Sequence, residues 1–168
     1  MRKVDFHNDV LPLKDKVFRL ALRITMDRVE AEDITQETLV RAWERRGEWS
    51  EIENMEAWVL TIARRLALDQ IQHSKMQSEK EAQIVNYQLS VVNSPASPDE
   101  QLDQRQRVEA VRRLIDQLPE VQRTIIELRD IEGLRYDEIA NITELSETQV
   151  KVYLHRARKK IKENLTRS

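Results

Sequence analysis

The sequence predicts an all-α protein, built from two small helical domains joined by a flexible linker, with a helix-turn-helix in the C-terminal domain. Only 2 glycines and 4 prolines occur among 168 residues, so few positions interrupt a helix. Apolar residues recur at spacings of three and four, which is the period of a helix with one buried face. The alternation typical of strands is absent, and we therefore expect no sheet.

The N-terminal part is expected to contain at least three helices. The first should bury one face, formed by Val17, Leu20, Ala21 and Ile24. The second is predicted over residues 31–46 and has two contrasting faces. The mostly apolar face carries Ile34, Thr38, Leu39, Ala42 and Trp43. The polar face carries Asp33, Gln36, Glu37, Val40, Arg41 and Glu44. Such a face is either simply solvated or binds a partner, and the pattern alone leaves both readings open.

The third helix of this part is predicted over residues 55–73. Its buried face should consist of Trp58, Val59, Ile62, Ala63 and Leu66. The opposite stripe combines cations with an exposed leucine, and its members are Thr61, Arg64, Arg65, Leu68 and Gln72.

Composition divides the chain into three parts. Residues 1–80 have a net charge of −1, residues 81–104 of −4 with no basic residue, and residues 105–168 of +3. The middle part is rich in asparagine, serine and proline, which disfavour packed elements. We therefore expect domains at 1–80 and 105–168, joined by a linker at 81–104.

Residues 136–161 have the pattern of a helix-turn-helix. The first helix offers a close-packing surface made of Ile139, Ala140 and Ile142. Residues 143–145 form the expected turn. Ser146 then has the properties of an N-cap, and Gln149 completes a capping box three residues later.

The second helix of this motif has one apolar and one basic face. The apolar face consists of Val150, Leu154, Ala157 and Ile161 and should be buried. The other face presents Thr148, Lys151, Val152, His155, Arg156 and Lys159, which suit base edges and phosphates in a major groove. From Lys151 to Arg167 seven basic residues oppose one acid, in a chain whose net charge is −2. The basic end is thus a local patch, typical either of DNA binding or of a solvated helix.

Other functional classes find little support. There is no cysteine, which excludes disulfides and thiolate metal sites and fits a reducing cytoplasm. The histidines His7, His73 and His155 lie in separate segments, and two glycines hardly suffice for a phosphate-binding loop. Residues 1–12 lack the apolar core of a signal peptide. We therefore expect neither an enzyme nor a metal or cofactor site.

Two parts of the chain resemble the extracytoplasmic-function sigma factors of bacteria. The run AEDITQETLVRAWERRGEW (31–49), followed by AWVLTIARRLALDQI (57–71), is similar to their second domain. The run LPEVQRTIIELRDIEGLRYDEIA (118–140), with VKVYLHRARKKI (150–161), is similar to their fourth. The order and separation of these runs also fit the family, which lacks the large third domain of primary sigma factors.

The resemblance implies roles for the faces described above. Core RNA polymerase would be bound at its clamp by Asp33, Gln36, Glu37, Val40 and Arg41. The minus-ten element would be contacted by Thr61, Arg64, Arg65, Leu68 and Gln72, after the preceding loop captures an unstacked base. The minus-thirty-five duplex would be read or held by Thr148, Gln149, Lys151, Val152, His155, Arg156, Lys159 and Lys160.

The implied partners are the clamp and flap regions of core RNA polymerase, promoter DNA and a cognate anti-sigma factor. No small-molecule substrate is implied, and the free chain is expected to be a cytoplasmic monomer. Several positions depart from the family pattern and bear on promoter choice: Arg65, Gln72, Glu144, Thr148, Val152 and Tyr153. The alternative function is a helix-turn-helix regulator that binds DNA without polymerase.

Overall fold

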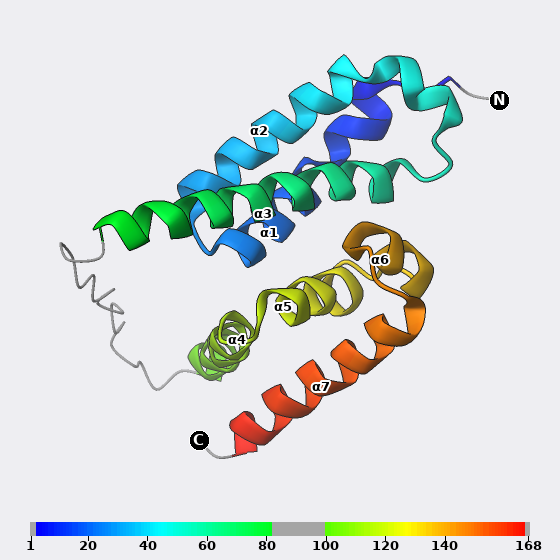
Figure 1. Ribbon diagram of the computed structural model, residues 1–168. Helices are drawn as coiled ribbons and strands as arrows, with labels where there is room; N and C mark the ends of the chain where they lie inside the picture. The colour runs from blue at the N-terminus through cyan, green and yellow to red at the C-terminus, as the bar shows by residue number, and fades with distance from the viewer. Residues whose placement is uncertain (1–2, 82–99, 167–168) are drawn as a thin grey trace.

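The computed structural model describes the backbone of residues 3–81 and 100–166 and the side chains of residues 3–76 and 103–166. Every element in these ranges is helical, which confirms the predicted all-α class. In chain order the elements are η1 (Phe6–Val10), η2 (Leu11–Leu13), α1 (Lys14–Thr25), α2 (Arg28–Glu44), η3 (Arg46–Glu51), α3 (Met55–Glu81), α4 (Glu100–Asp116), α5 (Glu120–Ile126), η4 (Glu127–Ile131), α6 (Tyr136–Thr143) and α7 (Glu147–Thr166). Figure 1 shows α1 to α3 grouped together and α4 to α7 forming a second group.

The N-terminal domain is a bundle in which α1, α2 and α3 all pack against one another. The predicted buried face of α1 is confirmed, because Val17, Leu20, Ala21 and Ile24 have no exposed surface. Burial of a side chain as large as Leu20 or Ile24 contributes about 1.5–3 kcal/mol. The apolar period of α1 therefore sets how the domain packs.

The second helix begins three residues before the predicted start. Asp27 is its N-cap: the carboxylate accepts hydrogen bonds from the backbone N–H of Val29 at 2.9 Å and of Glu30 at 3.2 Å. These two N–H groups would otherwise lack partners at the helix start. The aspartate thus accounts for the extra turn of α2.

The expectation that Trp43 faces the core is wrong. Its side chain is 47% exposed, whereas Trp49 is buried and donates its indole N–H to the carbonyl of Ala42 at 3.1 Å. The short 3-10 helix η3 brings Trp49 back against the end of α2. Trp49 is buried there, at the position that helical spacing predicts for Trp43. Trp43 instead lies at the edge of an aromatic cluster, with its ring 5.6 Å from that of Phe6.

The C-terminal domain is formed by α4, α5, η4, α6 and α7. Its centre contains large apolar side chains from all five elements and from the loop after α4, all less than 5% exposed: Ile115, Leu118, Ile125, Leu128, Ile139, Ile142 and Leu154. The long helix α7 packs against α4, α5 and α6. Its apolar stripe is therefore the seam that joins the helices of this domain.

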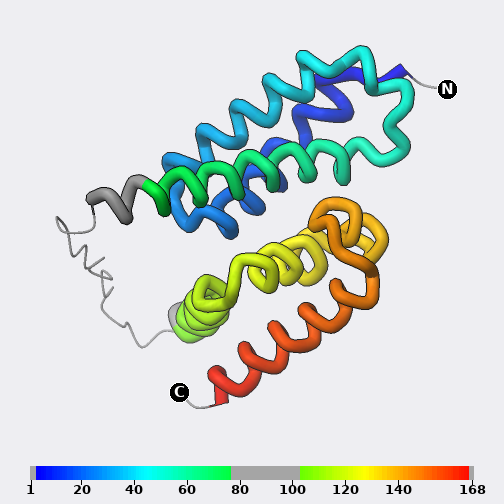
Figure 2. The backbone as a smooth tube through the Cα atoms, in the orientation of Figure 1, coloured from blue at the N-terminus to red at the C-terminus, as the bar shows by residue number. Residues whose placement is uncertain are grey.

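The helix α4 begins at Glu100, inside the range 81–104 that the sequence assigns to a linker. Residues 82–99 of that predicted linker lie outside the described residues. The two domains touch each other directly: α6 packs on α3, and α5 packs on α1. Figure 2 shows α5 and α6 running along the same side of α3, with α6 beside its N-terminal half.

Candidate nucleic-acid interface

The turn of the predicted helix-turn-helix is made with a non-glycine residue. Helix α6 ends at Thr143, and Glu144 adopts a left-handed conformation with φ of 62°. The backbone N–H groups of Glu144 and Leu145 both bond to the carbonyl of Ala140, which closes the helix end. A side chain in this conformation costs roughly 1 kcal/mol relative to glycine, so the departure from the family pattern at Glu144 introduces local strain.

The start of α7 is fixed by the predicted capping box. The N–H of Gln149 donates to the hydroxyl of Ser146 at 3.1 Å, and the N–H of Ser146 donates to the amide oxygen of Gln149 at 2.9 Å. The box supplies partners to backbone donors that the helix leaves free. It also gives the side-chain oxygen of Gln149, a predicted base reader, one hydrogen-bond partner within the chain.

The two faces of α7 are as predicted. Val150, Leu154 and Ala157 are buried and Ile161 is half-buried. All eight residues predicted to contact the minus-thirty-five duplex are exposed: Thr148, Gln149, Lys151, Val152, His155, Arg156, Lys159 and Lys160. The Lys151 ammonium lies 5.3 Å from the centre of the Tyr136 ring, a contact that holds it near the start of α6. A cationic helix face is thus presented on a rigid support.

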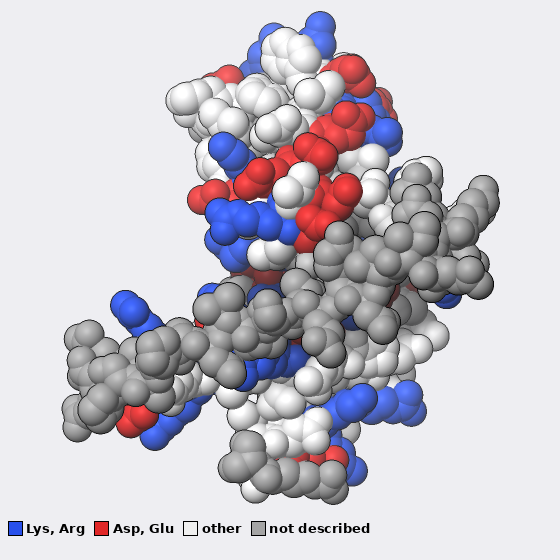
Figure 3. All heavy atoms as spheres, turned by 90° about the vertical axis from the view of Figure 1, so that its left-hand side faces the viewer, with Lys and Arg blue, Asp and Glu red and all other residues white. Residues whose placement is uncertain are grey.

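The predicted polymerase-binding residues form one exposed face of α2: Asp33, Gln36, Glu37, Val40 and Arg41. Glu37 and Arg41 form an ion pair at 3.0 Å, one turn apart. Such exposed pairs contribute only about 0.3–0.5 kcal/mol, so a partner can displace this one at little cost. Figure 3 shows acidic side chains forming a band across the N-terminal domain.

The predicted minus-ten stripe on α3 is only partly exposed. Gln72 and Arg65 are exposed, but Arg64 is only 8% exposed and Leu68 is half-buried, so the expected exposure of these two residues is wrong in this structure. Arg64 is covered because the second domain packs on α3 and brings the Glu120 carboxylate within 3.9 Å. The Thr61 hydroxyl donates to the carbonyl one turn earlier in its own helix.

Trp58, at the start of α3, is half-buried rather than fully buried. The guanidinium of Arg45 lies 5.2 Å from the centre of its ring. One face of the indole therefore contacts a cation at the end of α2.

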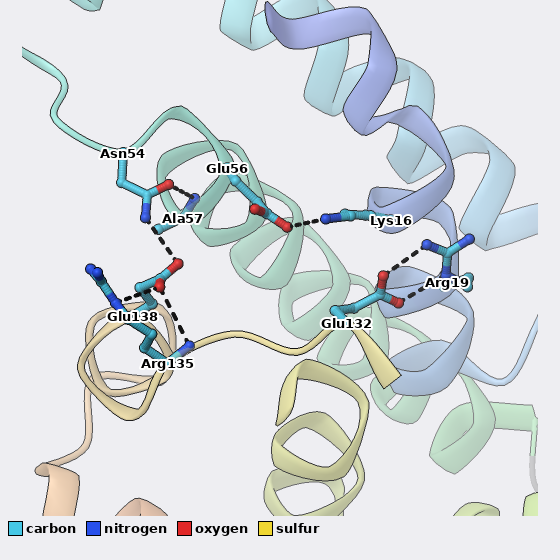
Figure 4. A network of polar contacts seen from close by, with 8 residues as sticks. All are labelled: Lys16, Arg19, Asn54, Glu56, Ala57, Glu132, Arg135 and Glu138. Atoms are coloured by element: carbon cyan, nitrogen blue, oxygen red, sulfur yellow. Dashed lines mark hydrogen bonds and ion pairs between the residues drawn. The ribbon is translucent and has the colours of Figure 1, made fainter. Parts of the chain in front are cut away.

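A polar network between the two domains was not predicted from the sequence (Figure 4). The Asn54 amide accepts from the N–H of Ala57 at 3.1 Å, as the N-cap of α3, and donates to the Glu138 carboxylate on α6 at 2.9 Å. Glu132 receives two hydrogen bonds from Arg19, at 2.7 and 2.8 Å. The cap of α3 has a local signal in the sequence, but no local pattern could indicate pairs between residues so far apart in the chain.

Glu127 is a fully buried carboxylate beside this interface, and neither of its oxygens has a hydrogen-bond partner among the described residues. Burial raises its pKa to about 6, although Arg23 lies 3.9 Å away and favours the charged form. Desolvation thus outweighs the attraction of the nearby cation. Glu132 adds to the increase, whereas Arg19 and Arg112 oppose it.

Replacing Glu127 with glutamine should stabilise the protein at pH 8 and change little at pH 4.5. The folded-state pKa of about 6 exceeds the ordinary value of 4.5, so ionisation destabilises the fold above pH 6 and has no effect below pH 4.5. The difference between the two pKa values corresponds to about 2 kcal/mol. Urea unfolding at both pH values measures it, with the exposed Glu163→Gln as the control. An effect of equal size at both pH values would contradict this account.

An apolar groove of about 670 Å³ lies between the domains, next to Glu127. Its floor consists of side chains from α4, α5, η4 and α7: Val108, Val111, Ile115, Ile126, Ile131, Ile161 and Leu165. The charged residues that line it are mostly cations, namely Arg19, Arg23, Arg107, Arg112, Arg158 and Lys162, together with the acids Glu127 and Asp130. The groove suits an apolar segment with acidic flanks.

Within the described residues, no group of three or more histidine, aspartate or glutamate side chains is placed to hold a metal ion. None of the helices in these ranges combines the length and apolar character needed to cross a bilayer.

A helix-turn-helix with a basic exposed face, joined to a helical domain with an acidic face, defines a two-domain DNA-binding protein. The model of sigma-70 region 2 matches residues 10–76, and that of sigma-70 region 4 matches residues 108–161. The RNA polymerase sigma-H factor of Pseudomonas aeruginosa is 30% identical over 162 residues, covering 90% of this chain and 81% of the relative. The ECF RNA polymerase sigma factor SigW of Bacillus subtilis is 27% identical over 157 residues, covering 90% and 84%. The chain belongs to the extracytoplasmic-function subfamily of the sigma-70 family.

A further relative, named Probable RNA polymerase sigma factor RfaY of Xanthomonas campestris, is 32% identical over 157 residues. The match covers 93% of this chain but only 39% of that relative's length. The fold is similar to that of the sigma factor RpoE in its co-crystal structure with the anti-sigma factor NepR from Bartonella quintana, with a TM-score of 0.75 and 21% identity. That comparison covers 96% of this chain and 97% of the other.

Proposed function

We propose that this chain binds core RNA polymerase, directs it to particular promoters and helps to open them. The observation that carries the proposal is the capped, basic α7 of the C-terminal domain, combined in one chain with the exposed polar face of α2. These two surfaces give one molecule separate contacts for DNA and for polymerase. The function needs no catalytic residue, cofactor or metal, and it places the chain in the cytoplasm with the transcription machinery.

The two domains would have separate binding roles. Residues 1–80 would bind the polymerase clamp and the minus-ten element, residues 105–168 the minus-thirty-five duplex, and residues 81–104 would join them. The α2 face made of Asp33, Gln36, Glu37, Val40 and Arg41 is exposed and could meet a basic clamp surface, where charge complementarity sets orientation and association rate. The groove above Ile126 and Ile131 is the surface we assign to the polymerase flap, because its floor is apolar and open.

The minus-ten contact belongs to α3 and the loop before it. Arg65 and Gln72 are exposed and suit contacts to the phosphates of a single strand. Thr61, Arg64 and Leu68 are assigned to the same surface. They become available once the second domain moves away from α3.

We also propose an anti-sigma factor as a partner. The similar RpoE chain was solved in complex with the anti-sigma factor NepR. In this chain the apolar groove, which is lined by six cations and two acids, supports binding of an acidic protein segment. Such a segment would compete with polymerase for the groove.

Two lysines of α7 should respond differently to alanine. Lys159→Ala should weaken binding to all duplexes about equally and reduce the salt slope by about 1, because a phosphate contact carries no sequence information. Lys151→Ala should also change which bases are preferred, since this lysine lies near the start of α7, where base edges are read. Anisotropy titrations against duplexes of varied sequence at several salt concentrations measure both. Lys14→Ala, at an exposed position of α1 in the other domain, is the control. Equal, sequence-independent losses from the two α7 substitutions would reject the assignment.

The alternative, a DNA-binding regulator that acts without polymerase, is tested by co-purification with core RNA polymerase followed by run-off transcription. Stable co-purification and promoter-dependent transcripts support the sigma function. A folded chain that binds DNA but not core polymerase would favour the regulator.

A further inference from the structure

Two cations lie against the ring of Tyr136, the first residue of α6. The guanidinium carbon of Arg129 is 4.4 Å from the ring centre, and the Lys151 ammonium is 5.3 Å from it. Both distances are within the range over which the negative face of an aromatic ring attracts a cation. The ring therefore connects Arg129 of η4 to Lys151, one turn after the start of α7.

The Tyr136 ring is held in place by its own domain. The side chain is half-buried and packs against the apolar core, so the ring has little freedom to move. Arg129 is also half-buried, and its Nη1 donates to the carbonyl of Leu134 at 2.8 Å. Leu134 is itself only 4% exposed. Backbone, guanidinium and ring thus form a rigid support beside the Lys151 side chain.

The ring is the partner that the structure gives to Lys151. This lysine is exposed, and within the described residues it forms no ion pair and donates no hydrogen bond. A lysine has a flexible stem and three N–H donors, so an unrestrained one can reach phosphates and base edges alike. The ring contact keeps the ammonium on the side of α7 next to the start of α6. Its N–H donors stay available to DNA there.

We infer that Tyr136 is a positioning residue for base recognition, which holds the Lys151 ammonium where it meets the O6 and N7 acceptors of one guanine. Lysine against guanine is a common specific contact in the major groove, and residues near the start of the second helix reach base edges. Ordering the side chain before DNA binds removes part of the entropic cost of that one contact. The inference rests on the proposed reading of the minus-thirty-five duplex by α7.

Nuclear magnetic resonance tests the contact without DNA. In the wild type, the Tyr136 ring should shift the ε-methylene proton signals of Lys151 upfield of those of Lys159, an exposed lysine on the same helix. Tyr136→Phe keeps a ring and should keep the shift. Tyr136→Leu removes the ring and should abolish it, with circular dichroism showing that the domain is folded. Lys151 signals at the position of the Lys159 signals in the wild type would overturn the inference, whatever DNA binding shows.

Duplex binding tests the consequence for base recognition. Duplexes selected by the wild-type chain from a randomised pool define its site, and anisotropy titrations then compare the four base pairs at each position. Lys151→Ala should reduce the preference for guanine at one position about tenfold. Tyr136→Leu should reduce it about threefold at the same position, whereas Tyr136→Phe should leave it unchanged. In the Lys151→Ala background, Tyr136→Leu should have no further effect on this preference, because it acts through the lysine.

The matched control is Tyr153→Leu. Tyr153 is a half-buried tyrosine of α7, and among the described residues no cation lies over its ring, so the guanine preference should not change. If Lys151→Ala reduces the preference but folded Tyr136→Leu does not, the inference is overturned and the proposed function stands. An equal effect of Tyr136→Leu with and without Lys151 would also overturn it. If Lys151→Ala alters no base preference, the proposed base-reading role of Lys151 fails, and the positioning role fails with it.

Discussion

The double variant Asp33→Lys, Glu37→Lys should lose stable co-purification with core RNA polymerase. Both carboxylates lie on the exposed face of α2, one turn apart, and two lysines would join Arg41 on that face. If the clamp presents basic groups, like charges would then meet across the interface at a cost of several kcal/mol. We expect binding to weaken by about a hundredfold or more.

The control for this variant makes the same change of charge elsewhere in the N-terminal domain. Glu51→Lys with Glu53→Lys alters two exposed acids before α3 and should leave co-purification intact. The α2 variant should also bind duplex DNA as the wild type does, because α7 is unchanged. Retained polymerase binding by the folded α2 variant would place the polymerase contact on another surface.

Leu154→Ala should destabilise the C-terminal domain by about 3 kcal/mol, because truncating a buried leucine removes apolar contacts and leaves a cavity. Leu154 is 2% exposed, on the buried stripe of α7 that packs against α5 and α6. Loss of this packing also removes the support for the exposed basic face. Urea unfolding followed by circular dichroism measures the stability, and duplex binding should weaken at temperatures where the domain unfolds.

The matched control lies two residues away on the same helix. Val152 is 41% exposed, so Val152→Ala should change stability by less than about 0.5 kcal/mol. Val152→Ala should instead change which bases are preferred, because Val152 is an exposed apolar side chain among the residues predicted to contact the minus-thirty-five duplex. Equal destabilisation by the two substitutions would mean that the two faces of α7 have been misassigned.

Local patterns in the sequence predicted the features that arise within single helices. The buried face of α1 follows from its apolar period, and the cap of α7 follows from Ser146 and Gln149 alone. Trp43 escaped prediction because a turn after α2 brings Trp49 into the position that the period assigned to it. Helical spacing predicts which side chains share one face of a helix, but it does not predict which later residues pack against the end of that helix.

For the same reason, only part of the candidate site could be predicted from the sequence. Exposure of the α2 and α7 faces follows from helical spacing, whereas the burial of Arg64 depends on a contact with Glu120 in the other domain. Arg123 of α5 donates hydrogen bonds to the carbonyls of Arg23 and Ile24 at the end of α1, a role that helical spacing does not indicate. Its place at the end of α1 is set by how whole domains pack, which no short window of sequence contains.

The aromatic cluster at the end of α2 has a consequence for spectroscopy. All three tryptophans of the chain, Trp43, Trp49 and Trp58, lie in the N-terminal domain. Their fluorescence therefore observes one domain, whereas far-ultraviolet dichroism observes the helices of both. Coincident melting curves from the two signals would mean that the domains unfold as one cooperative unit.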